Sequence, residues 1–471
     1  MIELGLSRVF RLLARTPLSW RAIHVAGTNG KGSICAYITG MLSAFNASDS
    51  RRDSDLPALK HGRFNSPHLI DRWDCISIDG ETISESIFHQ VETRVHERNN
   101  RENIQATEFE LLTATAFEIF TQENVDIGVI EVGMGGRLDA TNVIGQFSDY
   151  DNPSESCTSM ENFRPKPLAT GICAIALDHQ GFLGNTLEQI STEKAGIMKS
   201  GVPVVLAPNR DVVIQNLIRI SDQVGVSEVL RVEDTEAYRK MWRHSFEPTD
   251  LDNDQIRRQN SAMAFSLTWL ALLQLGHFKG HSQASLACLA EAFYNVPSNT
   301  IWPGRVQDVS IECITGHKPL ILVDGAHNAE SAQALANTVR KRTAGNRPVI
   351  WLLGASKGKD IRSMLEHFLS VQSPETPSVV IATRFGSVDG MPWVKAMSSS
   401  EVLDEARKVV DEVDSTRSTI LCDQDTSCLQ RALAEACRYA TPVNGLIVLA
   451  GSLYLVGDLL RLVRDKGGKI A

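Results

Sequence analysis

The residues best suited to chemistry lie in a glycine-rich segment near the N-terminus, which reads HVAGTNGKGS from His24 to Ser33. It follows an apolar run and precedes a helical pattern over Ile34–Phe45. A turn followed by a helix directs backbone N–H groups and the positive end of the helix dipole at one point. Glycines let the backbone approach an anion, and a lysine adds charge for β- and γ-phosphates. The segment therefore predicts a phosphate site formed by Thr28, Asn29, Gly30, Lys31, Gly32 and Ser33. The alternative is a glycine-rich turn with an exposed lysine.

The spacing departs from the common phosphate loop G-x-x-x-x-G-K-[ST], because Gly32 separates Lys31 from Ser33. This variant resembles the loop of ATP-dependent amide ligases of the Mur type. A second candidate is Glu131, which ends an apolar run where the sites of α/β proteins usually lie. A carboxylate followed closely by Gly-Met-Gly-Gly suits a metal ligand, and a solvated acid at a strand end is the alternative.

These residues need a scaffold of parallel strands. Short apolar runs alternate with helical patterns such as Ser331–Arg342 and Asp425–Tyr439, which predicts an α/β protein with helices on the faces of its sheets. The expected strands form two series, Ala22–Ala26, Ile127–Val132, Ile172–Leu177 and Val202–Ala207, and then Leu320–Val323, Val349–Leu353, Val379–Ala382 and Leu446–Ala450. Two series predict two domains with a boundary within Asn295–Arg305. Residues 47–60 and 145–167 are polar and are interpreted as surface loops.

The composition restricts the classes of function. Of 471 residues, 43% are hydrophobic and 22% are charged, and the net charge is −9. A single core stops growing at about 250–300 residues, so this length also favours two domains. The acidic balance argues against nucleic-acid binding, and no apolar run approaches the roughly 20 residues that cross a bilayer. The nine cysteines include no C-x-x-C pair. We therefore expect no disulfide framework and no structural zinc, and a reducing, cytoplasmic compartment.

Further segments occur in the order typical of one protein family. They are Asn65–Leu69, Thr107–Glu110, Glu131–Asn142, Leu177–His179, Leu183–Thr186, Glu193–Ile197, Arg258–Asn260, Trp302–Arg305, Asp324–Asn328 and Gly451–Tyr454. Together they span nearly the whole chain and resemble folylpolyglutamate synthase and dihydrofolate synthase of the Mur ligase superfamily. The opening residues Ile2–Arg8 look most like fungal monofunctional dihydrofolate synthases. The resemblance implies an N-terminal P-loop domain of Mur-ligase type over residues 1–300, which binds ATP and the pterin. It also implies a C-terminal Rossmann-like glutamate ligase domain over residues 301–471.

The resemblance also implies the reaction and the roles of the site residues. ATP phosphorylates a carboxylate, and the amine of L-glutamate attacks the acyl phosphate, which gives ADP and phosphate. Two Mg²⁺ ions are expected, the first held by Ser66 and Glu131 and the second by His179. By resemblance Lys194 is carbamylated, and a monovalent cation is a further candidate cofactor. The implied catalytic residues are Lys31, Lys194 and His327, and the implied nucleotide contacts beyond the loop are Asn260, Arg305 and Asp324. His327 and Ser452 are expected near glutamate, although Asp324 as a helix cap and Ser452 as a turn residue are alternatives.

Members of the family differ in the substrate to which they add glutamate, called the acceptor below. Members that extend the glutamate tail of folates usually carry Glu-Arg-Ile where this chain has Asp74-Cys75-Ile76, so that arginine is absent. Thr107, Phe109 and Asp139 match pterin-site positions of the bacterial bifunctional enzyme. These features favour a dihydrofolate synthase that joins glutamate to dihydropteroate. Because Arg72 lies nearby, folylpolyglutamate synthase or a bifunctional enzyme stays open. A nucleotide-binding protein without ligase activity, and a Mur ligase for cell-wall precursors, have less support.

The expected partners are therefore small molecules: ATP, L-glutamate, and dihydropteroate or a reduced folate. We expect no nucleic-acid or membrane partner and a monomer. Arg8, Arg11 and Arg15 lie at near-helical spacing, which is typical of an amphipathic first helix and leaves mitochondrial import open.

Overall fold

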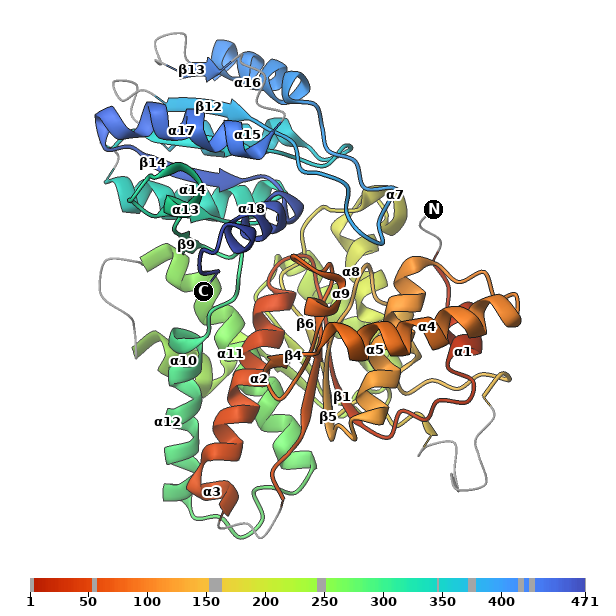
Figure 1. Cartoon of the computed structure of the whole chain (residues 1–471). Coiled ribbons are helices and arrows are strands. Elements are labelled where there is room, and N and C mark those ends of the chain that lie inside the picture. The colour runs from red at the N-terminus through yellow and green to blue at the C-terminus, as the bar shows by residue number, and fades with distance from the viewer. Residues whose placement is uncertain are drawn as a thin grey trace. The chain divides into compact units, whose positions relative to one another are not determined.

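The structure is a computed structural model of the chain (Figure 1), and it describes residues 4–52, 57–151, 163–243, 251–344, 347–371, 378–413, 419–422 and 428–470. Its contacts form two compact units. The first contains the described residues of Met1–His68, Trp73–Phe246 and Gln255–Thr300, and the second contains those of Leu69–Arg72, Glu247–Asp254 and Ile301–Ala471. Within this described part of the chain, no helix is both long and apolar enough to cross a membrane.

The first unit is built on an eight-stranded sheet with the order β4-β3-β2-β5-β1-β6-β7-β8. The strands from β2 to β8 in that order run parallel, and β3 and β4 form an antiparallel edge. The bounds are β1 (Arg21–Ala26), β2 (His61–Phe64), β3 (Ile76–Ile78), β4 (Glu81–Thr82), β5 (Ile127–Glu131), β6 (Ala169–Ile172), β7 (Val204–Leu206) and β8 (Val229–Arg231). The central strands are apolar on both sides because helices cover both faces of the sheet.

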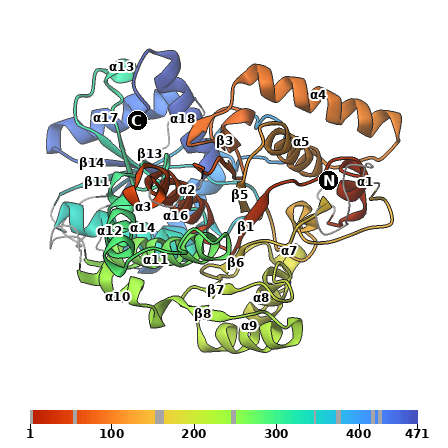
Figure 2. The same ribbon diagram turned by 90° about the horizontal axis from the view of Figure 1, so that it is seen from below.

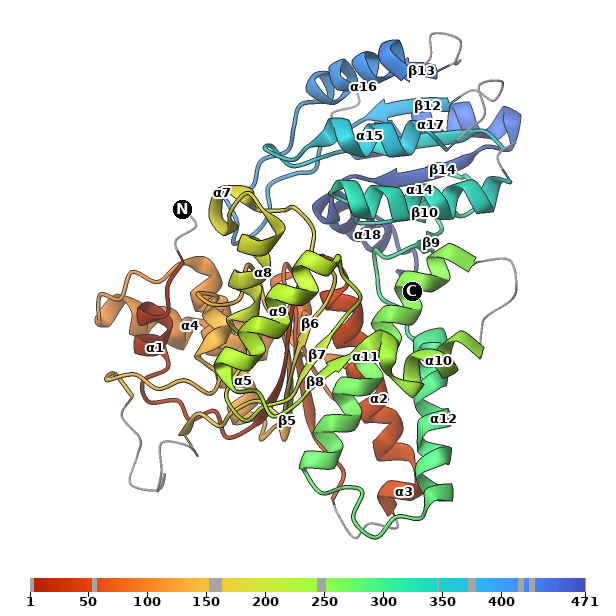
Figure 3. The ribbon, with the colours of Figure 1, turned by 180° about the vertical axis from the view of Figure 1, so that it is seen from behind.

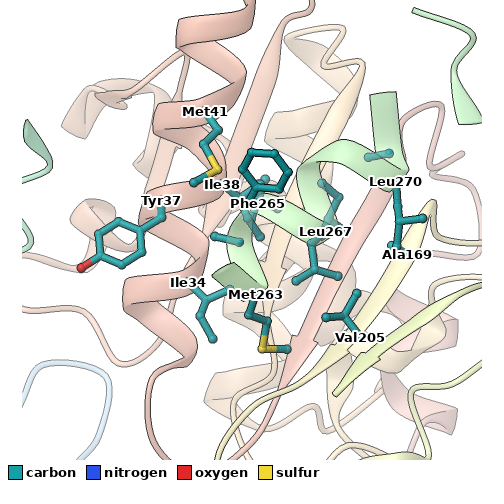
Figure 4. Packing of buried hydrophobic residues seen from close by; sticks show 14 of the residues in the cluster. Ile34, Tyr37, Ile38, Met41, Ala169, Val205, Met263, Phe265, Leu267 and Leu270 are labelled. Carbon is teal, nitrogen blue, oxygen red and sulfur yellow. The ribbon is translucent and has the colours of Figure 1, made fainter. Parts of the chain in front are cut away.

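Two groups of helices provide that cover (Figure 2). On one face lie α2 (Lys31–Ala47), α11 (Leu251–Gln274) and α12 (Gln283–Asn299), whose buried side chains, among them Ile38, Phe265 and Leu267, pack against β1, β5 and β6 (Figure 4). On the other face lie α1 (Ser7–Leu12), α4 (Glu85–Arg101) and α5 (Glu108–Gln122), over a cluster in which Trp20 meets Phe117 and Phe120 edge to face. Alternate residues of β1 face the two clusters, as the twofold period of a strand requires.

The remaining elements of the first unit are shorter. Helices α8 (Leu187–Ala195) and α9 (Asp211–Val224) lie side by side near β7 and β8 (Figure 3). The others are α3 (Asp49–Arg52), α7 (Gln180–Leu183), α10 (Glu236–Arg243) and the 3₁₀ turns η1 (Arg72–Cys75), η2 (Ala140–Val143) and η3 (Val232–Asp234), of which η1 begins in the second unit. The predicted loops at 47–60 and 145–167 are described only in part, because residues 53–56 and 152–162 lie outside the described residues.

The second unit has a six-stranded sheet with the order β13-β12-β11-β14-β10-β9, parallel except for β9. The strands are β9 (Gln307–Val309), β10 (Ile321–Val323), β11 (Val349–Leu353), β12 (Ser378–Ala382), β13 (Thr419–Cys422) and β14 (Leu446–Ala450). The helices are α13 (Glu312–Thr315), α14 (Ala329–Thr343), α15 (Ile361–Leu369), α16 (Ser399–Val413), α17 (Leu429–Val443) and α18 (Leu453–Asp465). Two buried clusters, one on each face, include α14–α16 and α17–α18 respectively.

The two parallel-dominated sheets confirm the α/β class predicted from the alternating pattern. Most expected strands overlap the observed ones to within two residues, but the strand expected over Ile172–Leu177 is wrong. The strand is β6, which ends at Ile172 because its pairing with β1 and β7 ends there. Beyond it the backbone turns, and the carbonyl of Ala174 accepts hydrogen bonds from the N–H groups of Thr28 and Asn29.

Candidate active site

Four neighbouring parallel strands of the first unit place the candidate functional residues at one edge of the sheet. β2 ends just before Asn65 and Ser66, β5 ends at Glu131, β1 ends just before Gly27, and β6 ends just before Cys173. Because parallel strands end on the same side, residues more than one hundred positions apart become neighbours. The carboxyl edge of this sheet is therefore the candidate active site.

The glycine-rich segment turns tightly between β1 and α2. Gly30 has φ 96° and caps α2, and a Cβ there would lie 2.6 Å from Oδ1 of Asn260 on α11. At Gly27 a Cβ would lie 2.0 Å from Sγ of Cys173. Glycine is thus required at both positions, by backbone conformation at the first and by close packing at both. The turn leaves the first N–H groups of α2 at the loop, as a phosphate site needs.

Lys31 lies against this turn. Its Nζ donates to the carbonyl oxygens of Gly27 at 3.2 Å and Thr28 at 3.3 Å, and it lies 3.8 Å from Oε1 of Glu131. Only 16% of the Lys31 side chain and 8% of the Glu131 side chain are exposed. The alternative of an exposed loop lysine is therefore wrong, and so is that of a solvated acid at the strand end.

Glu131 is held from its other side by the segment after β2. Oε2 of Glu131 accepts a hydrogen bond from Nδ2 of Asn65 at 2.8 Å and a longer one from the N–H of Ser66 at 3.4 Å. A buried carboxylate whose neighbour in the chain fold is a serine fits Mg²⁺, which uses one or two protein oxygens and completes its shell with phosphates and water. Among the described residues no three His, Cys, Asp or Glu side chains gather into a group that could hold a metal ion.

Lys194 reaches the same loop from α8. Its side chain is buried, and Nζ donates to the carbonyl oxygen of Gly27 at 2.7 Å, across 167 positions of sequence. Burial and, to a smaller extent, the charge of the nearby Lys31 ammonium lower the pKa of Lys194 to about 7. The lowered pKa increases the fraction of neutral amine near neutral pH, and the neutral amine is the reactive form of lysine.

His179 differs from these groups in its environment. It precedes α7 with φ 53°, its N–H donates to Oδ1 of Asp178 at 2.9 Å, and 43% of its side chain is exposed. The structure thus gives it an open position after β6 rather than a buried one. Its role as a metal ligand stays a prediction.

The three residues expected to bind the pterin have unequal environments. Thr107 is the N-cap of α5 and forms a capping box with Glu110. Phe109 is half-buried, and its ring stacks on Phe64 at 6.3 Å between centroids, in contact with Gly133. Asp139 is buried and accepts from the N–H of Met134 at 2.8 Å and from both N–H and Oγ1 of Thr141. Burial raises the pKa of Asp139, and these bonds oppose that shift.

The second unit has its own cluster at the carboxyl ends of β10 and β14. Asp324 follows β10, is buried, and accepts from the N–H groups of Val306 and Ala326, both at 2.8 Å. Arg305 lies close to Gly325, and its charge opposes the rise that burial causes in the pKa of Asp324. Nδ1 of His327 lies 2.8 Å from the carbonyl oxygen of Gly325, and Ser452 caps α18. Asp324 therefore ties two loop segments together and does not cap α14, whose N-cap is Asn328.

Sequence reasoning assigned no role to two residues of the first site. Asn65 bonds to the metal-ligand candidate Glu131, and Asn209 bonds to the backbone after β6. Both are amides that follow a strand at its carboxyl end, and this position was the signal that could have found them.

A glycine-rich loop at the carboxyl edge of a parallel sheet, followed by a second α/β unit, is the architecture predicted above for P-loop ligases of the Mur type. Solved structures share this fold. The folylpolyglutamate synthase of Mycobacterium tuberculosis complexed with ADP and AMPPCP matches with TM-score 0.71 and 22% identity, over 99% of this chain and 96% of that one. The bifunctional folylpolyglutamate synthase/dihydrofolate synthase of Yersinia pestis complexed with AMPPNP and Mn matches with TM-score 0.67 and 22% identity, over 98% and 94%.

Sequence relatives extend the likeness to the family. The "Probable dihydrofolate synthetase" of Schizosaccharomyces pombe is 35% identical over 98% of this chain and 99% of its own length. The dihydrofolate synthetase of Saccharomyces cerevisiae is 32% identical over 98% of both chains, and the Bacillus subtilis dihydrofolate synthase/folylpolyglutamate synthase is 27% identical over 98% and 96%. Residues 307–462 match the model of the dihydrofolate synthetase C-terminal domain. The chain belongs to the dihydrofolate synthetase and folylpolyglutamate synthase family, which confirms the family predicted from the motifs.

Proposed function

We propose that the chain joins L-glutamate to dihydropteroate, with ATP hydrolysed to ADP and phosphate through an acyl phosphate. As a member of this family the chain is an ATP-dependent ligase. The observation that carries the proposal is the convergence of Lys31, Glu131 and Lys194 on the Gly27–Ser33 loop. Full-length similarity to two fungal dihydrofolate synthetases supports dihydropteroate as the acceptor.

In this proposal the loop and Lys31 bind the β- and γ-phosphates, and Asn260 contacts the nucleotide beside Gly30. Ser66 and Glu131 would hold Mg²⁺, which supplies charge neutralisation for phosphoryl transfer. Asn65 orients Glu131. The low exposure of Lys31 and Glu131 would limit the access of water to the transferred phosphoryl group. His179 as ligand of a second ion is part of the same proposal.

We also propose that Lys194 carries a carbamate. The neutral amine favoured by its lowered pKa is the form that attacks carbon dioxide. The nitrogen lone pair forms a bond to the carbon of CO₂, one N–H proton leaves to solvent, and an anionic carbamate results. That change would place an anion beside Lys31, suited to a second metal ion.

The acceptor and glutamate sites complete the proposal. Phe109 would stack on the pterin ring, and Thr107 and Asp139 would position the loop around it. Arg305 and Asp324 in the second unit are proposed nucleotide contacts, and His327 and Ser452 are proposed contacts of the incoming glutamate. A monovalent cation, a monomeric state and a cytoplasmic location stay predictions.

Folylpolyglutamate synthase activity is the second candidate, because relatives of that kind also match the chain. Two observations count against it. Cys75, at the position of the missing arginine, is buried in the apolar cluster of the first unit. Arg72, the candidate replacement, packs against Gly390. A Cβ built on that glycine would lie 3.2 Å from the guanidinium carbon of Arg72.

Glutamate-dependent ADP release with MgATP tests the proposal directly. The assay compares dihydropteroate with a reduced folate monoglutamate as acceptor. Turnover with dihydropteroate alone is the expected result. Turnover with both acceptors would establish a bifunctional enzyme, and turnover with the folate alone would contradict the proposed acceptor. Negligible turnover with either would favour a nucleotide-binding protein without ligase activity.

A further inference from the structure

The phosphate loop is bonded to the segment that follows β6. The N–H groups of Thr28 and Asn29 donate to the carbonyl oxygen of Ala174 at 2.8 and 3.2 Å. Oγ1 of Thr28 accepts from the N–H of Ala176 at 3.1 Å and lies 3.3 Å from the Ala176 carbonyl oxygen. The position of residues 173–176 therefore sets the conformation of the loop.

Asn209 holds that segment from its opposite side. Oδ1 of Asn209 accepts from the N–H of Ile175 at 2.8 Å, and Nδ2 donates to the carbonyl oxygens of Cys173 at 3.4 Å and Ala207 at 3.0 Å. The bond from Ile175 N–H requires an oxygen at that end of the amide, so the orientation of the side chain follows from its partners. The Ala207 bond fixes Asn209 to the end of β7.

We propose that Asn209 is a positioning residue for the nucleotide. It clamps residues 173–175, and this segment in turn holds Thr28 and Asn29 in the conformation that receives phosphates. The inference rests on the proposed ATP site and adds a residue that touches none of the reacting groups. Loss of Asn209 should weaken ATP binding and not dihydropteroate binding. The segment that Asn209 holds bonds to the phosphate loop and not to α5, which carries the proposed acceptor residues Thr107 and Phe109.

Asn46 provides a matched control. It too is half-buried and clamps backbone, since Nδ2 donates to the Leu59 carbonyl oxygen at 2.8 Å and Oδ1 accepts from the Leu59 N–H at 2.9 Å. It lies near the opposite end of α2, about 22 Å from Lys31 at 1.5 Å per residue. Asn46→Ala removes a comparable clamp without touching the phosphate loop.

The experiment titrates ADP into purified full-length enzyme by calorimetry and measures the KM of ATP, dihydropteroate and glutamate. For Asn209→Ala we expect ADP affinity to fall and the KM of ATP to rise, each about tenfold, since one net hydrogen bond contributes about that factor. The KM of dihydropteroate and of glutamate should stay within twofold. Asn46→Ala should lower the melting temperature and leave ADP affinity within twofold.

Several results would overturn the inference. These are wild-type ADP affinity in Asn209→Ala, equal rises in the KM of ATP and of dihydropteroate, or an equal loss of ADP affinity in Asn46→Ala. If Asn209→Ala does not fold, Asn209→Asp keeps the bond from Ile175 N–H and loses both donors, and wild-type ADP affinity in that variant would also overturn it. Failure of the wild-type enzyme to bind ADP would instead remove the proposed nucleotide site, and this inference with it.

Discussion

Lys31 and Glu131 form a close pair with little access to solvent, and each is also held by polar groups of the chain. The lysine bonds to two carbonyl oxygens of its own loop, which are neutral acceptors that a phosphate can replace. A bond from the ammonium to an anionic phosphate adds the attraction between opposite charges to the hydrogen bond itself. In the proposed nucleotide complex, Lys31 would exchange contacts with neutral oxygens for contacts with charged ones.

Lys31→Ala should lower kcat for ADP release by at least about 100-fold, the usual loss when one charge-stabilising group is removed. The melting temperature should stay nearly unchanged, because Glu131 keeps its bonds to Asn65 and Ser66. Lys60→Ala is the control, since Lys60 pairs with Glu123 at the surface. Near-normal turnover of Lys31→Ala would remove Lys31 from the site.

Lys194 predicts a pH dependence of stability. The pKa of Lys194 is about 7 in the folded chain and 10.5 in the unfolded one, so between these values the unfolded state binds more protons. Stability should therefore rise with pH from about 7 to 10.5, by up to about 1.4 kcal/mol per pH unit. The measurement compares urea unfolding of the wild type with Lys194→Met, in buffer free of carbon dioxide. A difference between the two that does not change with pH would contradict the lowered pKa.

At the scale of elements, α5 shows how local sequence prepares a site. Thr107 and Glu110 form a capping box that fixes the first turn, and Phe109 lies within that turn. Glu110 also accepts a bond from Nε of Arg8 at 2.8 Å, so α1 supports the same turn. The residues proposed to bind dihydropteroate, Thr107 and Phe109, are thereby placed at a well-defined helix start.

Thr107→Ala should cost about 1 kcal/mol of unfolding free energy, the usual value of an N-cap, and should also raise the KM of dihydropteroate. Ser84→Ala removes the N-cap of α4, where Ser84 accepts from the N–H of Ile87. This control should lose similar stability with unchanged kinetics. Equal KM values in the two variants would show that the α5 cap serves stability alone.

At the scale of the whole molecule, each unit has its own sheet and its own buried clusters. Phe117 is buried in the first unit, and Phe368 stacks on Trp351 in the second at 4.6 Å between centroids. A chain with two such cores need not unfold in one step.

Heat unfolding should therefore depart from a two-state transition, with a van't Hoff enthalpy below the calorimetric one. Phe117→Leu and Phe368→Leu each remove volume from one core. Each should lower the unfolding temperature of a different part of the transition. Scanning calorimetry checks this. A single transition that both variants lower equally would mean that the units unfold together.

The sequence by itself determined the glycine-rich turn between β1 and α2, the parallel α/β architecture and the family. These depend on local features, namely glycine spacing, apolar period and short motifs, which are readable without knowing where the chain goes next. The prediction of a strand over Ile172–Leu177 was wrong, because pairing with β1 and β7, and not apolar content, decides where β6 ends.

Only the tertiary structure decided how distant groups meet. Lys194 bonds to Gly27, Asn65 bonds to Glu131, and Asn209 clamps the segment beside the loop. Parallel strands bring such residues to one edge whatever their separation in sequence, and the packing around them removes water. That burial sets the pKa of Lys194 and the low exposure of Lys31 and Glu131, which are properties of the folded environment and not of any residue type.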